Sequence, residues 1–320
     1  MKKYIVLVLT IVLLTNCNSP KSGVPVVGFV DAFEDNTIAQ AKNGFIDALK
    51  KNGLDENNGT VKILYRNAQG NIPTLTQIVK YFISEKVSVM ATSPSLSTVA
   101  AIQNTKTIPI FMMVAPTPSL MKVIDSGGRA PANLFGVAED LAYIDTSFLL
   151  IPKLIGQKAG KMKVGMIFNQ SEPQSVVARD RIAQLAANNN IDLVSLPVNS
   201  SADVQLITAF LLAKGIDAFF ANPDNTVFAS FETIAKACNK ANVPVFTSEA
   251  GLVARGALAA YGADIYQWGY QAGEQAAQYI KSADKAGFKW EMVKIRKRVY
   301  NAAAARTFHV SIPAGFEAIQ

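Results

Sequence analysis

The sequence is poor in the residues that most often carry catalysis, with one histidine, two cysteines and two tryptophans among 320 residues. A single histidine, His309, leaves no pair to hold zinc, and no Gly-x-Ser-x-Gly nucleophile elbow occurs. Cys17 and Cys238 are too few for a disulfide framework, which a chain of this length does not need. We therefore expect no catalytic residue, no metal site and no other cofactor.

The start of the chain has an apolar stretch, residues 4–14, that is shorter than the roughly 20 residues of a membrane-spanning helix. It follows two lysines and precedes Cys17, an arrangement typical of a secretory signal over residues 1–16. The preceding Leu-Thr-Asn resembles a bacterial lipoprotein processing site, although Asn16 replaces the usual small residue. We expect Cys17 to be acylated and residues 17–23 to tether the fold to a membrane. The alternative is an ordinary secretory signal with an incidental cysteine.

The net charge of +7 is spread along the chain, with one local basic run at residues 294–298. Charged and apolar residues alternate in that run, which indicates a strand with one exposed face. A secreted location argues against a nucleic-acid partner, and we expect none. Cys238 falls in an expected helix with an alanine-rich face, which favours a small core residue over a nucleophile.

From residue 25 onward, apolar segments of strand length alternate with amphipathic helices. Strands are predicted at residues 25–30, 61–65, 87–91, 108–114, 163–168, 192–197, 217–221, 243–247 and 257–261, and helices at 37–51, 73–85, 95–104, 175–189, 202–214 and 226–241. This alternation predicts parallel sheets covered on both faces. Residues 89–111 and 218–246 look like copies of one strand–helix–strand unit, which indicates two similar lobes with a cleft at the carboxyl ends of their strands.

The mature chain resembles the periplasmic-binding-protein type I lipoproteins of the ABC substrate-binding class, including those for tryptophan and tyrosine. The resemblance runs from residue 25 to 313 and rests on Gly44-Phe45 with Leu49 and Gly53, Ala91-Thr92-Ser93 before Ile108-Pro109-Ile110-Phe111, Asn169 with Glu172 and Ser175, Pro223-Asp224 with Val227 and Ser230, Tyr261-Gly262-Ala263-Asp264 with Gly269, and Ile312-Pro313. One departure is Thr117-Pro118-Ser119, where the family often has Asp-Pro-Val.

The resemblance implies two Rossmann-like α/β lobes joined by a three-stretch hinge. The N-terminal lobe would comprise residues 24–135 plus 263–288, and the C-terminal lobe residues 136–262 plus 289–320. The chain would cross between the lobes near residues 135–139, 262–264 and 289. The resemblance further implies a monomeric, lipid-anchored receptor in the periplasm or at the cell surface of a bacterium, which captures a small molecule for an ABC permease and its ATPase.

Two strand-to-helix turns are candidates for binding the charged groups of a ligand. Thr92, Ser93 and Ser95 offer hydroxyls and free N–H groups at a helix N-terminus, which suit a carboxylate. Asp224, in the equivalent turn of the second lobe, could accept an ammonium group, and the family match favours this role. In both turns the side chains could instead only cap the following helix. Asp31, Glu34 and Asp35 are weaker candidates for the ammonium.

Further candidates follow the strand at residues 163–168. Asn169, Ser171 and Gln174 could donate hydrogen bonds to ligand, although turn chemistry alone also explains them. The aromatic residues expected at strand ends, Phe33, Phe168 and Tyr261, could enclose a ring or could pack in the cores. These candidates favour an amino acid ligand, aromatic rather than aliphatic. The alternatives are a nucleoside or sugar, for which neither tryptophan is expected in the cleft, and a ligand-sensing module for a membrane receptor.

Overall fold

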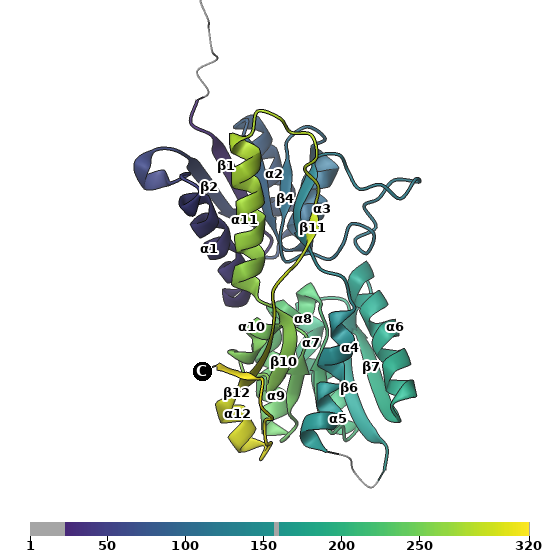
Figure 1. Ribbon diagram of the computed structural model, residues 1–320. Helices are drawn as coiled ribbons and strands as arrows, with labels where there is room; N and C mark the ends of the chain where they lie inside the picture. Colours follow the sequence, from purple (N-terminus) through teal and green to yellow (C-terminus); the bar gives the residue numbers. More distant parts are fainter. Residues whose placement is uncertain (1–22, 157–159, 320) are drawn as a thin grey trace, which may run out of the picture.

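The computed structural model describes residues 23–156 and 160–319, so the expected signal and Cys17 lie outside the described residues. The chain forms two lobes along the long axis of Figure 1, each built on its own β-sheet. The two-lobed α/β architecture predicted from the sequence is therefore confirmed. Among the described residues, no helix combines the length and the apolar character needed to cross a membrane.

The first lobe contains a six-stranded sheet in the order β11-β5-β4-β3-β1-β2, in which all neighbouring strands are parallel. Its strands are β1 (Val26–Asp31), β2 (Lys62–Asn67), β3 (Val89–Ser93), β4 (Ile110–Met112), β5 (Leu134–Ala138) and β11 (Glu291–Met292). Its helices are α1 (Asn36–Lys51), the 3-10 helix η1 (Glu56–Asn58), α2 (Ile72–Ser84), α3 (Ser95–Asn104) and α11 (Ile265–Lys281).

The second lobe contains a seven-stranded sheet in the order β13-β12-β10-β9-β8-β6-β7, in which β10 and β12 alone pair antiparallel. Its strands are β6 (Met162–Asn169), β7 (Ile191–Val198), β8 (Ala218–Ala221), β9 (Val245–Thr247), β10 (Ala259–Ala263), β12 (Arg296–Asn301) and β13 (Glu317–Ile319). Its helices are α4 (Tyr143–Phe148), α5 (Leu150–Ile155), α6 (Pro173–Asn188), α7 (Ser201–Ala213), α8 (Asn225–Ala229), α9 (Phe231–Lys240), α10 (Ala250–Val253) and α12 (Ala302–Thr307).

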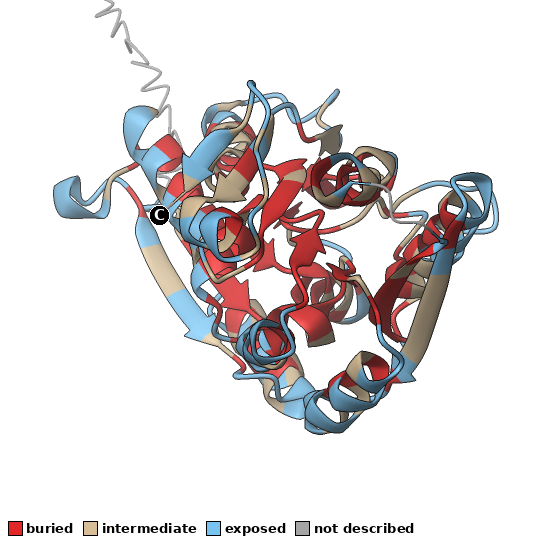
Figure 2. Cartoon of the chain, turned by 90° about the horizontal axis from the view of Figure 1, so that it is seen from below, coloured by how far each residue is buried: buried red, intermediate tan, exposed pale blue. Residues whose placement is uncertain are grey.

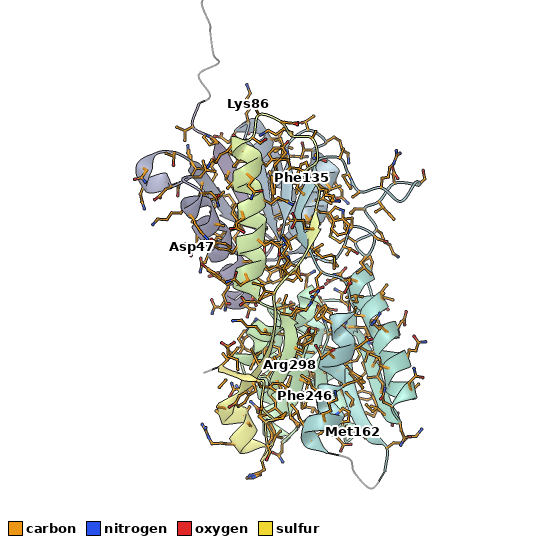
Figure 3. The ribbon with its side chains drawn as sticks, in the orientation of Figure 1. Asp47, Lys86, Phe135, Met162, Phe246 and Arg298 are labelled. Carbon is orange, nitrogen blue, oxygen red and sulfur yellow. The ribbon has the colours of Figure 1, made fainter. Side chains whose placement is uncertain are left out.

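Each sheet has a buried core on both faces, as near-continuous apolar strands require. Figure 2 shows buried strands at the centre of the molecule and exposed faces on the surrounding helices. Phe135 in the first lobe and Phe246 in the second are both buried, and Figure 3 shows them well separated in the two lobes. The basic run lies largely in β12, where Arg296 and Lys297 are half-buried, Arg298 is exposed and the following Val299 is buried.

The chain crosses between the lobes three times, as the family resemblance implies. The crossings are residues 139–142 between β5 and α4, Asp264 between β10 and α11, and residues 293–295 between β11 and β12. The sheets extend the first lobe beyond two of the expected boundaries. β5 continues to Ala138 rather than ending at 135, and β11 pairs with β5 although residues 289–320 were expected in the second lobe.

Candidate ligand-binding cleft

A cavity lies between the lobes, at the carboxyl ends of strands from both sheets, and its lining residues surround about 490 Å³ of space that includes open solvent. The first lobe contributes Ile38, Pro94, Ser95, Val114, Ala115, Pro116 and Trp268, the crossing after β5 contributes Glu139, Asp140 and Leu141, and the second lobe contributes Tyr143, Gln174, Pro223, Asp224, Asn225, Phe228 and Glu249. The apolar part of the wall includes Ile38, Trp268 and Phe228, and the charged residues of the wall are all acidic. No lysine, arginine or histidine is among these lining residues.

Glu249 is a buried carboxyl of this wall that has no cationic partner in the part of the chain that the structure describes. It follows β9 and precedes α10, but its side chain does not cap that helix. The Tyr143 hydroxyl donates to Glu249 Oε1 at 2.8 Å, the one hydrogen bond to this carboxyl among the described residues. Burial raises the pKa of Glu249 to about 8, against the lowering effect of the Tyr143 hydrogen bond and with a further rise from the charge of Glu139. The site can therefore accept a cationic group that would restore the Glu249 charge.

Glu139 differs because Arg296 neutralises it. Arg296 Nε donates to Glu139 Oε2 at 2.9 Å and Arg296 Nη2 donates to Oε1 at 2.5 Å, a bidentate pair. Burial still raises the pKa of Glu139, while Arg296 opposes the rise. The pair joins the first crossing to β12, so Glu139 serves the hinge as well as the cavity wall.

Asp224 lines the cavity, but four protein donors already satisfy its carboxylate. Its Oδ1 caps α8 by accepting from the N–H groups of Thr226 and Val227 at 2.7 and 3.0 Å. Its Oδ2 accepts from the Asn169 N–H at 2.6 Å and from the Ser175 hydroxyl at 2.5 Å. Burial raises its pKa against these hydrogen bonds. The capping role of Asp224 is thus confirmed, and little acceptor capacity remains for a ligand ammonium.

A polar bridge connects the lobes beside the cavity. Asn225 Nδ2 donates to Ser95 Oγ of the first lobe at 3.0 Å and to Glu172 Oε2 of the second at 2.7 Å. Gln174 Nε2 donates to the same Glu172 oxygen at 2.6 Å. Burial, and next the charge of Asp224, raise the pKa of Glu172 to about 8. Gln174 and Ser95 also border a second hollow, together with Ser171.

The turn that holds Thr92, Ser93 and Ser95 leads into α3, and one expectation was that its side chains cap this helix. Pro94 occupies the N-cap of α3, and no side chain caps this helix. Ser95 lies in the cavity wall, whereas Thr92 bonds internally to Thr98 at 2.9 Å. Ser93 Oγ is buried and has no partner among the described residues. The capping alternative for Ser93 and Ser95 is wrong, and Ser95, the first residue of α3, lines the cavity at a helix start without a side-chain cap.

The other predicted residues lie outside the cavity wall. Asn169 donates to Thr226 Oγ1 at 2.9 Å and accepts from the Ser171 N–H, so it organises the turn that holds Asp224. Phe33 is buried in the first core. The Phe168 ring lies 4.6 Å from the Arg179 guanidinium and the Tyr261 ring 5.0 Å from that of Arg298. The three aromatic residues are therefore not brought together around one space.

Trp268 was expected outside the cleft, and this expectation is wrong. Trp268 is in the first turn of α11, directly after the second crossing, and it lines the cavity. Its indole N–H donates to the Val137 carbonyl at 2.8 Å, which fixes the ring in place. Tyr143 and Glu249 were also missed. Glu249 could have been found, because it follows a strand at the same sheet edge as Asp224. In the described part of the chain no acidic, histidine or cysteine cluster could hold a metal ion.

The fold and the cavity between its lobes are those of a solute-binding receptor, and the sequence agrees. Residues 25–317 match the family model of the ABC transporter substrate binding proteins, so the chain belongs to that family. The tyrosine-binding protein of Clostridioides difficile (strain R20291) is 32% identical over 255 residues, which are 80% of this chain and 72% of that protein.

Two solved structures share the architecture of both lobes. A conserved domain protein from Vibrio cholerae O1 biovar El Tor strain N16961 is 27% identical and superposes with a TM-score of 0.81, covering 92% of this chain and 99% of that one. An ABC domain from Streptococcus pneumoniae in complex with L-Trp superposes with the same TM-score and coverage at 19% identity, which shows a likeness of fold.

Proposed function

We propose that the protein is the extracytoplasmic binding component of an ABC importer, and that its ligand is an amino acid, preferably an aromatic one. The observation that carries the proposal is the interlobe cavity, whose lining combines carboxyl groups, no basic residue, and apolar side chains that include Trp268. In this role the lobes close over the ligand, and the closed receptor docks on a permease that an ATPase drives.

The two charges of an amino acid have separate partners in this cavity. The ammonium group would lie against Glu249, whose buried carboxyl has no cationic partner among the described residues, and Asp140 is a further acidic residue of the cavity lining. The carboxylate would accept from the uncapped N–H groups at the start of α3, next to Ser95. An aromatic side chain would pack against Trp268, Ile38 and Phe228. The names of the tyrosine-binding relative and of the L-Trp complex support this ligand class.

A second candidate ligand is a sugar or nucleoside, and Trp268 is the observation that favours it. Saccharide and nucleoside sites commonly combine a flat aromatic ring with carboxylate and amide acceptors. Trp268, Asp140 and Asn225 all line the cavity and would meet that requirement. The ligands differ in one respect that can be tested: an amino acid needs its free ammonium group.

The first test is calorimetric titration of the chain from residue 18 onward, which contains every described helix and strand. We expect L-tryptophan, L-tyrosine or L-phenylalanine to bind, and the N-acetyl derivative of the same amino acid to bind at least about 100-fold more weakly, because the buried carboxyl would lose its cation. Binding of sugars or nucleosides alone would replace the amino acid proposal by the second candidate. Equal binding of the N-acetyl derivative would contradict the role of Glu249.

Anchoring is proposed separately, because Cys17 lies outside the described residues. Acylation of Cys17 would leave a short tether before β1 begins at Val26, and so hold the lobes close to the membrane surface. Metabolic labelling with a clickable palmitate analogue should mark the wild-type chain and not the Cys17→Ala variant. Labelling that persists in the variant would contradict this site.

A further inference from the structure

Arg255 of the second lobe contacts the first lobe through its guanidinium. It follows α10, and its side chain is 14% exposed. Arg255 Nη1 donates to Asp35 Oδ2 of the first lobe. Its other nitrogens stay within the second lobe, where Nε and Nη2 donate to the two Glu232 oxygens at 2.7 and 2.8 Å, and Nη2 also donates to the Phe228 carbonyl at 3.0 Å. The guanidinium is therefore oriented by its own lobe before it meets Asp35.

Asp35 is likewise held by its own lobe. Its side chain is 1% exposed, and Oδ1 caps α1 by accepting from the N–H groups of Thr37 and Ile38, both at 2.9 Å. Only Oδ2 is left for Arg255. Because each partner keeps bonds within its lobe, the contact between them can break and re-form as the lobes separate, and neither charge is then left buried without a partner.

The lobes approach very closely beside this ion pair. A Cβ atom added to Gly251 of α10 would lie 1.9 Å from Thr37 Cγ2 of α1, so no side chain fits there while the lobes are in this position. The same segments hold the cavity wall, because Ile38 follows Thr37 and Phe228 accepts from Arg255. Closure at Gly251, the Asp35–Arg255 contact and completion of the apolar wall therefore occur together.

We propose that the Asp35–Arg255 ion pair sets ligand affinity by stabilising the closed position of the lobes, without contacting the ligand. Both are positioning residues, and neither lines the cavity. The inference rests on the proposed function, since a ligand enclosed by both lobes binds to the closed form alone. Its apparent dissociation constant then rises in proportion as the closed fraction falls.

The test separates closure from folding and from ligand identity. Asp35→Asn keeps the helix cap, since asparagine caps as well as aspartate, and removes the charge that meets Arg255. The matched control is Asp125→Asn, which makes the same change at an ion pair within the first lobe, with Arg129. Spin labels on cysteines replacing the exposed Lys80 and Gln184 report the distance between lobes. Cys238 is buried and burial raises its thiol pKa to about 12, so it does not compete for the label.

We expect Asp35→Asn to populate longer interlobe distances without ligand and to weaken L-tryptophan or L-tyrosine binding about 10-fold, chiefly through faster dissociation. Asp125→Asn should change neither. Unchanged distances and affinity in Asp35→Asn, with thermal unfolding like the wild type, would overturn the proposal. If neither amino acid binds the wild-type chain, the ligand assignment fails, and the ligand-free distances still decide whether the ion pair holds the lobes closed.

Gly251 gives an independent test if Asp35→Asn unfolds. Gly251→Ala should open the lobes, because the new methyl group meets Thr37 Cγ2. Adding Thr37→Ser removes that carbon atom and should restore the wild-type distances. A Gly251→Ala variant that closes normally would contradict the close approach on which the inference depends.

Discussion

At the scale of single residues, the acidic wall contains carboxyls of different kinds. Arg296 balances Glu139, and four donors satisfy Asp224, but Glu249 has one tyrosine hydroxyl and no cation as partners among residues 23–156 and 160–319. A buried carboxyl without a cation stays protonated well above its ordinary pKa. With a pKa of about 8, Glu249 holds its proton at neutral pH until a positive group arrives. Glu249 therefore links ligand binding to proton release.

We predict that amino acid binding releases close to one proton per ligand at pH 7, and that affinity rises between pH 6 and 8. The ammonium stabilises the ionised Glu249, so the proton must leave when the ligand binds. Calorimetry in buffers of different ionisation enthalpy measures this proton. Glu249→Gln should abolish the release and weaken binding at least about 10-fold. Glu172 also has a pKa of about 8, so Glu172→Gln is the control, and release that disappears there instead would contradict the assignment.

The residues of the site were only partly predictable. Asp224 was predicted as a cleft residue because it follows a strand. A sequence does not say, however, whether a carboxylate at the start of a helix faces the N–H groups of that helix or a cavity. The structure gives both orientations, Asp224 toward α8 and Glu249 toward Tyr143. Trp268 could not be found by that rule, because it lies inside a helix whose start reaches the cleft only through the second crossing.

At the scale of elements, the closest packing in the first lobe is that of α1 against α11. A Cβ atom on Gly269 would lie 1.8 Å from the Ala41 carbonyl oxygen, and one on Gly44 would lie 2.0 Å from that of Tyr266. The two helices are therefore in backbone contact, although they lie more than 200 residues apart in the chain. This contact keeps Trp268 of α11 and Ile38 of α1 in the same cavity wall.

We predict that Gly269→Ala lowers the free energy of unfolding by about 2 kcal/mol or more, because the methyl group has no room and the helices must separate. Urea unfolding followed by circular dichroism measures the change. Gly160→Ala is the matched control, since its added Cβ meets nothing within 4 Å. Equal stability of the two variants would contradict the close packing of α1 against α11.

The long elements were predictable because their periodicity is strong. The helix expected at residues 37–51 is α1 at Asn36–Lys51, and the strand expected at 163–168 is β6 at Met162–Asn169. The shortest elements carry no such pattern. β11 has two residues and exists because the chain passes beside β5, a contact that only the assembled lobe provides. The expected lobe boundary at 289 failed for this reason.

At the scale of the whole molecule, motion between the lobes depends on the three crossings. Glu139 begins the first crossing, and Arg296 begins β12 directly after the third, so their bidentate pair ties two crossings together. The Glu139 side chain is 3% exposed and the Arg296 side chain 25% exposed. Removing one partner of such a pair destabilises the fold, because the remaining carboxylate would be buried without a cation.

We predict that Arg296→Ala lowers the free energy of unfolding by about 3 kcal/mol and that most of this loss is regained in the double variant Glu139→Gln/Arg296→Ala.

In the single variant, loss of Arg296 removes the influence that lowers the pKa of Glu139, so its folded-state pKa rises further above the unfolded value. A carboxyl with a raised folded-state pKa loses stability as pH increases toward that pKa, so the single variant should be more stable at pH 5 than at pH 7. Urea unfolding at both pH values checks this. A single variant whose stability does not fall between pH 5 and 7 would show that water replaces Arg296 at the hinge, and that the pair does not hold the crossings together.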